Sequence, residues 1–136
     1  MLIVLVRTFR GYTSELTANL KFMTPYFSIL IPAFKVSYLK ECIESILAQI
    51  YKNFEVIIVD DASPYDICSI VSQFNDERIR YYRNEVGFGA YNVVGNWNKC
   101  LGFATGDYVI CMGDDDKLKP CCLEGKQPIL TYCKKK

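Results

Sequence analysis

The sequence predicts an α/β fold in which an open, mostly parallel sheet carries helices on its flanks. From Phe27 onward, four short apolar runs alternate with segments whose apolar residues recur at the helical spacing of three and four. This alternation is typical of βαβ units, in which a helix crosses over between parallel strands. The length of 136 residues and the apolar content of 51% fit one domain with a sizeable core.

The first strand is predicted at Phe27–Ala33, which is a mainly apolar run. The segment after it places apolar side chains on one helical face, at Leu39, Cys42, Ile43, Ile46, Leu47 and Ile50. The second strand is predicted at residues 54–59. Together these elements form the first βαβ unit.

Ser63 and Pro64 predict where the next helix begins, because serine is a favoured N-cap and proline a favoured first helical residue. Asp66 stands three residues after Ser63, where its carboxylate would complete a capping box. We therefore assign Asp66 to the helix and not to a ligand site. The helix continues along the apolar stripe of Ile67, Ile70, Val71 and Phe74.

The third strand is predicted at residues 78–83, before a loop that contains Gly87 and Gly89. The third helix is predicted from an apolar stripe of Val93, Val94, Trp97, Leu101 and Ala104. The fourth strand is predicted at residues 108–112, and Pro120 would open one more helix.

The charge balance and the missing histidine exclude several classes of function. With 16 Lys+Arg against 15 Asp+Glu, the net charge of +1 gives no electrostatic footprint for nucleic acid. The absence of histidine excludes Ser-His-Asp and Cys-His nucleophilic sites and histidine-ligated zinc. What remains is chemistry by carboxylates, oxygen-bound metals, lysine, tyrosine and cysteine.

The cysteines and the first six residues indicate the cellular compartment of the chain. The seven cysteines include no C-x-x-C pair, and Cys42, Cys68, Cys100 and Cys111 lie in apolar patterns typical of reduced, buried thiols. The six apolar residues before Arg7 are too short for a secretory signal or a membrane span. We expect a cytoplasmic chain, with peripheral association at the inner face of the membrane left open.

Acidic residues follow two of the predicted strands. Asp60 and Asp61 come after the second strand, and Asp114, Asp115 and Asp116 follow the fourth. In open parallel sheets, ligands bind at the carboxyl ends of the strands, and Mg²⁺ or Mn²⁺ takes one or two carboxylates plus substrate phosphates. A solvated turn is the alternative for the triplet, and a turn residue for Asp60. Two acidic clusters at one sheet edge favour a metal site.

These features form an ordered set of motifs. The chain reads FSILIPAF from Phe27, SILAQ from Ser45, YKNFE from Tyr51, VDDAS from Val59, RNE from Arg83, ATGDY from Ala104, and then the Asp114–Asp116 triplet. In order and spacing, this set resembles the nucleotide-binding half of family 2 glycosyltransferases. The resemblance covers residues 27–124.

The resemblance implies a GT-A fold, which is Rossmann-like, and a nucleoside diphosphate sugar as donor, with a UDP-sugar expected. It implies that Asp61 reads the nucleobase, with Asp60 beside it. Donor-binding residues implied in the same way are Pro32, Ala33, Phe34 and Asp114. The triplet resembles the D-x-D metal site for Mn²⁺ or Mg²⁺, with Asp115 at its last position and Asp114 and Asp116 beside it.

Two residues depart from the family pattern. Gly113 stands where many members have the first aspartate, so Asp114 and Asp115 are left to hold the ion or its waters. Lys35 stands where an asparagine is common after the aromatic residue.

The chemistry that the resemblance implies is metal-dependent, inverting transfer of a sugar to an acceptor hydroxyl, in the synthesis of surface polysaccharides. The acceptor would be a saccharide or a lipid-linked saccharide. The family's carboxylate base lies in the second half of the domain, beyond this chain, so no catalytic residue is assigned. Association with the membrane surface and homo-oligomers remain open.

The resemblance also suggests boundaries along the chain. Residues 1–22 form a leader without a counterpart in the family, and we expect Met23 to be the biological start. Residues 23–124 form the nucleotide-sugar-binding part. Residues 125–136 are an atypical tail, which we interpret as the result of a frame break near Glu124.

Two other functions stand beside the transferase hypothesis. The first is a non-catalytic nucleotide-sugar-binding or interaction module. The second is a receiver-like signalling domain, which would need a lysine after the last of five strands and is disfavoured because none is found. Tyr91, Trp97 and Asn98 lie at helical spacing, so we assign them to the core or the helix surface and not to the site.

Overall fold

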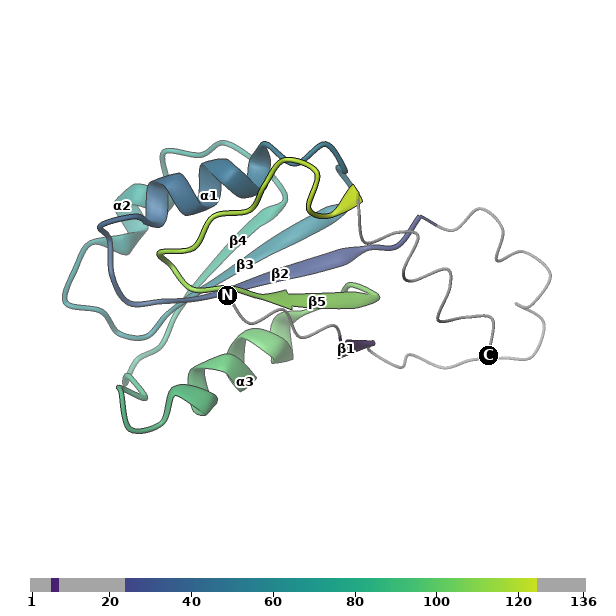
Figure 1. Ribbon diagram of the computed structural model, residues 1–136. Coiled ribbons are helices and arrows are strands. Elements are labelled where there is room, and N and C mark those ends of the chain that lie inside the picture. The colour runs from purple at the N-terminus through teal and green to yellow at the C-terminus, as the bar shows by residue number, and fades with distance from the viewer. Residues whose placement is uncertain (1–5, 8–23, 125–136) are drawn as a thin grey trace.

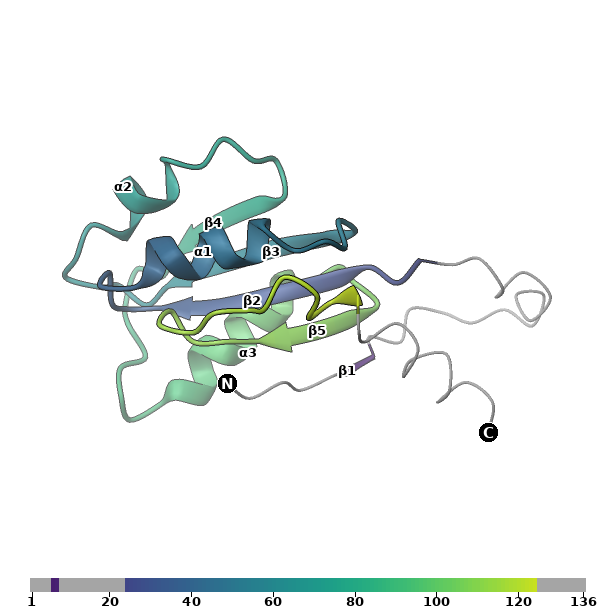
Figure 2. The ribbon, with the colours of Figure 1, turned by 45° about the horizontal axis from the view of Figure 1, so that its top comes forward.

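The computed structural model describes residues 6–7 and 24–124, and its centre is a five-stranded sheet in the order β1-β5-β2-β3-β4. Four strands are parallel, as predicted: β2 (Phe27–Ala33), β3 (Phe54–Asp60), β4 (Ile79–Arg83) and β5 (Tyr108–Cys111). The fifth, β1 (Val6–Arg7), runs antiparallel to β5. Figures 1 and 2 show this open sheet from two directions. The rest of the predicted leader and the tail at 125–136 lie outside the described residues.

Helices cover both faces of the sheet. α1 (Leu39–Leu47) and α2 (Ile67–Val71) lie on one face, and α3 (Val93–Phe103) lies on the other (Figure 1). The larger apolar cluster fills the space under α1 and α2, and a smaller one lies under α3. β3 is buried along its whole length, which is typical of a central strand between two helical layers. Among the described residues, no helix is long and apolar enough to cross a membrane.

The strand registers bring the ends of neighbouring strands to one edge. Ala33 at the end of β2 pairs with Asp60 at the end of β3, and Asp60 pairs with Arg83 at the end of β4. The loops that follow these strands therefore begin side by side. This carboxyl edge is where both acidic clusters lie.

α1 is shorter than its apolar pattern predicts. The helix ends at Leu47, and Ile50 lies beyond it with 56% of its surface exposed. The backbone N–H of Ile50 donates to the carbonyl of Pro120, and the side-chain amide of Gln49 donates to the carbonyl of Lys119. These contacts with the segment after β5 replace the next helical turn. Pro120 itself lies in a turn at 120–123, and the described residues contain no helix that it opens.

The predicted start of α2 was wrong. The helix begins at Ile67, and Asp66 is its N-cap, with its carboxylate accepting from the N–H of Ser69 at 3.0 Å. Hydrogen bonds from Ser69 lower the pKa of Asp66. The hydroxyl of Ser63 is used elsewhere, because it donates to the carbonyl of Phe34 and accepts from the N–H of Tyr65. Ser63 therefore joins two loops and does not cap the helix.

The predicted buried face of α3 was also wrong. Val93, Val94 and Leu101 are 51%, 65% and 39% exposed, whereas the side chains buried against the sheet are Asn96 and Cys100. Hydrogen bonds of Asn96, described below, determine which face of α3 packs against the sheet. The apolar stripe does not. Trp97 is half-buried and Asn98 is exposed on the same helix.

A buried carboxylate joins the strands near their amino ends. Glu55 of β3 accepts from the hydroxyl of Ser28 at 2.6 Å and from the N–H of Thr105 at 2.7 Å, and it pairs with Arg80 at 3.1 Å. The hydroxyl of Ser28 also accepts from the N–H of Gly106. A Cβ on Gly106 would lie 2.7 Å from two backbone atoms, so only glycine fits there. This cluster holds the turn between α3 and β5 against the sheet.

We expect Glu55→Gln to lower the free energy of unfolding by about 1–3 kcal/mol, because its amide would face the Arg80 guanidinium with a donor in place of an acceptor. Urea unfolding followed by circular dichroism measures this change. Glu44→Gln, on the exposed side of α1, is the matched control. Equal stability of the two variants would contradict the structural role of Glu55.

Candidate functional site

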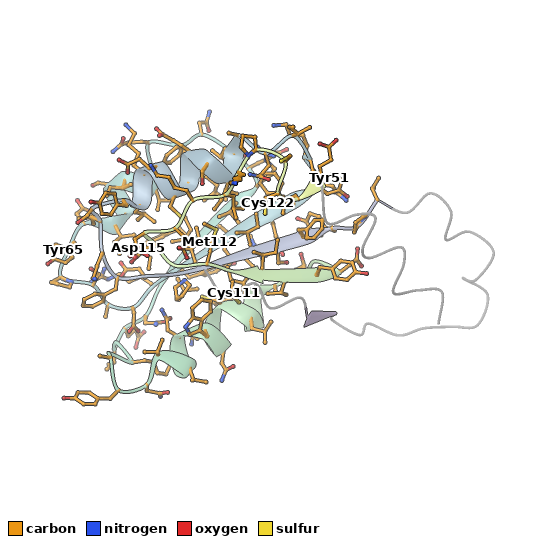
Figure 3. All side chains as sticks on the ribbon, in the orientation of Figure 1. Tyr51, Tyr65, Cys111, Met112, Asp115 and Cys122 are labelled. Atoms are coloured by element: carbon orange, nitrogen blue, oxygen red, sulfur yellow. The ribbon has the colours of Figure 1, made fainter. Side chains whose placement is uncertain are left out.

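The candidate site lies at the carboxyl edge of the sheet, where the loops after β2, β3 and β5 meet. The carboxylate of Asp114 accepts from the backbone N–H groups of Phe34 and Lys35, both at 2.7 Å. On the other side, the hydroxyl of Ser63 donates to the carbonyl of Phe34. The loop that carries Phe34 is thus fixed between the two acidic clusters. In Figure 3, Asp115 lies toward the same end of the sheet as Tyr65 and away from Tyr51.

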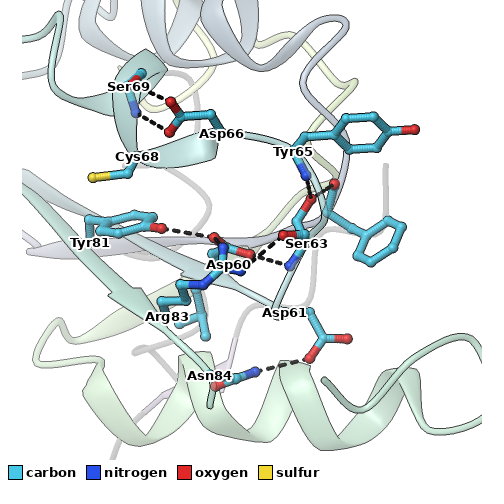
Figure 4. A network of polar contacts seen from close by, with 12 residues as sticks. Asp60, Asp61, Ser63, Tyr65, Asp66, Cys68, Ser69, Tyr81, Arg83 and Asn84 are labelled. Carbon is cyan, nitrogen blue, oxygen red and sulfur yellow. Dashed lines mark hydrogen bonds and ion pairs between the residues drawn. The ribbon is translucent and has the colours of Figure 1, made fainter. Parts of the chain in front are cut away.

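Asp60 is fully buried and holds its surroundings together. One oxygen accepts from the N–H of Ser63 at 2.8 Å, and the other accepts from the hydroxyl of Tyr81 at 2.8 Å and pairs with Arg83 (Figure 4). Burial, with the contribution of Asp60, raises the pKa of Tyr81 to about 12. The carboxylate of Asp60 therefore binds the turn after β3 and strand β4, and its assignment to the donor site stays a prediction.

Asp61 holds the loop that follows β4. Its Oδ1 accepts from the side-chain amide of Asn84 at 3.0 Å and from the N–H of Phe88 at 2.8 Å, while Oδ2 accepts from the N–H of Gly89 at 2.9 Å. The next residue, Ala62, has a φ of 53°, which turns the chain sharply after the strand. Asp61 is 8% exposed.

Glycine is required at position 87 by this close packing. A Cβ there would lie 2.6 Å from the carbonyl oxygen of Asp61. The loop at 84–89 therefore fits closely over the end of β3. A cavity of about 520 Å³ lies on this loop, between the end of β4 and α3, and its lining includes Asn84, Phe88 and Lys99.

The three aspartates of the triplet differ in their contacts and exposure. Asp114 faces the Phe34 loop, and Asp116 accepts from the N–H of Gly113 at 2.8 Å. Asp115 is exposed, and its Oδ1 lies 2.9 Å from the place that a Cβ on Gly113 would take. Among the described residues, no group of three acidic, cysteine or histidine side chains is arranged to hold a metal.

This arrangement fits a metal that is bound together with phosphate. Mg²⁺ and Mn²⁺ commonly keep several waters and take one or two protein carboxylates, with the remaining ligands supplied by substrate phosphates. Asp115 provides one exposed carboxylate, and the glycine at 113 leaves room for it. The assignment of Asp115, Asp114 and Asp116 as metal ligands stays a prediction.

The predicted pocket residues at the end of β2 and just after it differ in their exposure. Ala33 is fully buried and its carbonyl accepts from the N–H of Asp61 at 3.0 Å. Pro32 is half-buried, while Phe34 is 44% exposed at the edge. The Phe34 ring is therefore the part of this segment that is accessible to a ligand, and the pocket assignment of all three stays a prediction.

Sequence reasoning missed Asn96, which lies 4% exposed on α3 and contacts Asn84 behind Asp61. No periodicity signals it, because a buried asparagine interrupts the apolar pattern of a helix. A signal for Asn84 was present in the RNE motif, although its contact with Asp61 was not foreseen.

Comparison with known proteins identifies relatives of this chain. The profile described as "Glycosyl transferase family 2" matches residues 28–126. The chain is 35% identical over 115 residues to the "Putative colanic acid biosynthesis glycosyl transferase WcaA" of Escherichia coli strain K12, covering 79% of this chain and 40% of that protein. It is 38% identical over 97 residues to the "GalNAc(5)-diNAcBac-PP-undecaprenol beta-1,3-glucosyltransferase" of Campylobacter jejuni, covering 69% of this chain and 31% of that protein.

Solved structures show the same fold. TarS of S. aureus in complex with UDP-GlcNAc matches with a TM-score of 0.72 and 24% identity, over 79% of this chain and 31% of the TarS chain. The mannosyltransferase PcManGT of Pyrobaculum calidifontis, in complex with GDP-Man and Mn²⁺, matches with a TM-score of 0.61 and 24% identity, over 70% of this chain and 29% of that chain. The fold is the GT-A, Rossmann-like fold that the motifs imply. The chain spans well under half of each of these proteins.

Cys42 lies beneath the acidic triplet, with its thiol 3.5 Å from the carbonyl of Gly113. Burial, followed by the charges of the three aspartates, raises its pKa to about 12, and burial raises that of Cys100 to about 12. Cys68, predicted to be buried, is instead exposed, as is Cys121. All six described cysteines are free.

We expect iodoacetamide at pH 8 to alkylate Cys68 and Cys121 in the folded chain and to leave Cys42 and Cys100 unmodified. At that pH, a thiol with a pKa of about 12 is thiolate in roughly one molecule in ten thousand, and the thiolate is the reacting form. Peptide mass spectrometry measures each site, with the urea-unfolded chain as control. Modification of Cys42 as fast as that of Cys68 in the folded chain would contradict this packing.

Proposed function

The chain belongs to glycosyl transferase family 2, and we propose that it forms the part of such an enzyme that binds a nucleoside diphosphate sugar. The observation that carries this proposal is the carboxyl edge, where the accessible ring of Phe34 lies on a loop fixed between Asp114 and the turn after β3. Ligands of open α/β sheets bind at this edge. TarS, which has the same fold, is in complex with UDP-GlcNAc, and a UDP-sugar is the donor we propose.

Asp61 would read the nucleobase. Three N–H groups already donate to its carboxylate, which can accept about four, so one position on Oδ2 is left for the N–H of a base. Pro32, Ala33 and Phe34 would line the same pocket. Asp60 would support this pocket from the end of β3, where its fully buried carboxylate accepts from the N–H of Ser63 in the following turn.

Mn²⁺ or Mg²⁺ would be held by Asp115 together with the diphosphate. The metal supplies stabilisation of the negative charge on the leaving nucleoside diphosphate. Asp114 would contribute by holding the backbone of Phe34 and Lys35 against the donor. PcManGT, which has the same fold, is in complex with Mn²⁺.

The full reaction would be an inverting transfer of the sugar to an acceptor hydroxyl, in polysaccharide synthesis. A carboxylate base would deprotonate the acceptor. The C. jejuni relative is named a glucosyltransferase of GalNAc(5)-diNAcBac-PP-undecaprenol. This name supports a saccharide or lipid-linked acceptor for this chain. For the protein we propose a location in the cytoplasm or, with a lipid-linked acceptor, at the inner face of the membrane.

We expect one nucleotide among UDP, GDP, dTDP and CMP to raise the melting temperature of the chain, and to do so only with Mn²⁺. A ligand at 100 times its dissociation constant adds about 2.7 kcal/mol, which corresponds to a shift of several degrees for a domain of this size. Differential scanning fluorimetry or calorimetry measures the shift. Asp115→Ala should abolish it, while Glu44→Ala on α1 should preserve it.

A cooperative transition that no nucleotide moves would contradict donor binding by this chain. A shift that persists in Asp115→Ala would contradict the metal assignment alone. Where a nucleotide binds, release of free sugar or its transfer is measured with the corresponding nucleotide sugar. Saturable binding without either reaction would identify the alternative, a non-catalytic nucleotide-sugar-binding module.

A further inference from the structure

Three buried side chains behind the candidate site are linked by hydrogen bonds in a line from Asp61 through Asn84 and Asn96 to the carbonyl of Val59, and the backbone of β3 closes this line into a ring. The side-chain amide nitrogen of Asn84 donates to Asp61 Oδ1 and to Asn96 Oδ1, each at 3.0 Å. The amide nitrogen of Asn96 donates to the carbonyl of Val59 at 3.3 Å, and Val59 is two residues before Asp61 on β3. The ring therefore joins the end of β3, the residue after β4 and helix α3. The three side chains are 4% to 8% exposed.

The ring fixes the orientation of both amides. A backbone carbonyl only accepts hydrogen bonds, so the Asn96 nitrogen must face Val59 and its oxygen must face Asn84. Asn84 then has to present its nitrogen to Asn96, which brings the second hydrogen of the same nitrogen to Asp61. The orientation set at Val59 is thus passed through two amides to the carboxylate.

The carboxylate of Asp61 is held from two sides as a result. Asn84 donates from one side, and the N–H groups of Phe88 and Gly89 donate from the loop. Without the amide of Asn84, only the N–H groups of Phe88 and Gly89 would hold the carboxylate of Asp61, and this carboxylate could rotate toward other partners. A preorganised acceptor binds more tightly because less freedom is lost when the ligand binds.

We infer that Asn96, acting through Asn84, is a positioning residue that aims the carboxylate of Asp61 at the nucleobase of the donor. This inference rests on the proposed function, in which Asp61 reads the base. Asn96 lies behind Asn84 and is 4% exposed, so it does not itself touch the ligand. This role also explains why α3 buries the side chain of Asn96, although its sequence pattern predicts that valine and leucine side chains are buried.

The experiment compares a nucleoside diphosphate with inorganic pyrophosphate, which has the diphosphate but no nucleoside. Using the full chain with Mn²⁺, isothermal titration calorimetry measures the affinity for UDP, or for GDP or dTDP where one of these shifts the melting temperature more, and for inorganic pyrophosphate. We expect Asn96→Ala to weaken nucleotide binding roughly tenfold, the usual effect of a lost buried hydrogen bond, and to leave pyrophosphate binding unchanged. Asn98→Ala, on the exposed side of the same helix, should change neither affinity.

Asn96→Asp provides a second variant of nearly the same shape. It keeps an acceptor for Asn84 but loses the N–H that binds the carbonyl of Val59, so we expect the same selective loss of nucleotide affinity. This variant decides the question if Asn96→Ala does not fold. The melting temperature of each variant is recorded beside its affinities.

Two results would overturn the inference. Equal weakening of nucleotide and pyrophosphate binding would show that Asn96 only supports the fold, and an unchanged nucleotide affinity in both variants would show that it does not position Asp61. A wild-type chain that binds pyrophosphate with Mn²⁺ but no nucleotide would overturn base reading by Asp61, and this inference with it. A wild-type chain that binds neither ligand would overturn the proposed function itself.

Discussion

The arrangement of the whole carboxyl edge depends on two adjacent carboxylates at the end of β3. Successive residues of a strand point to opposite faces of a sheet, so the side chains of Asp60 and Asp61 lie on different faces. Asp60 binds Tyr81 and Arg83, which come from β4. Asp61 binds the loop at 84–89 and, through Asn84, helix α3. One dipeptide thereby fixes the strand end, the following loop and the helix on the far face.

Burying two neighbouring carboxylates costs free energy unless their oxygens are satisfied. Here Asp60 has a guanidinium as partner, whereas Asp61 relies on neutral N–H donors alone. The sequence meets this requirement with a glycine at 87, which lets the loop backbone approach, and with asparagines at 84 and 96. A change at either asparagine leaves a buried donor or acceptor unpaired, and a Cβ at position 87 would lie 2.6 Å from the carbonyl oxygen of Asp61.

The sequence predicted the strands well and the helix boundaries poorly, for a physical reason. β2 and β3 are buried on both faces, so their apolar runs mark them to within a residue. The end of α1, the start of α2 and the buried face of α3 are instead decided by Pro120, Phe34 and Val59, which are distant in the chain. A single sequence shows periodicity, and it does not show which distant carbonyl a polar side chain will find.

The same distinction explains the acidic residues. Their order along the chain predicted that Asp60, Asp61 and Asp114 would share one edge, and the structure brings their loops together. The sequence could not show that Asp114 and Asp116 bind backbone N–H groups, which leaves Asp115 exposed. With one such carboxylate, a metal would gain most of its ligands from phosphate and water. On the proposed function, metal and nucleotide therefore each raise the affinity for the other, and this coupling has the same size in both directions.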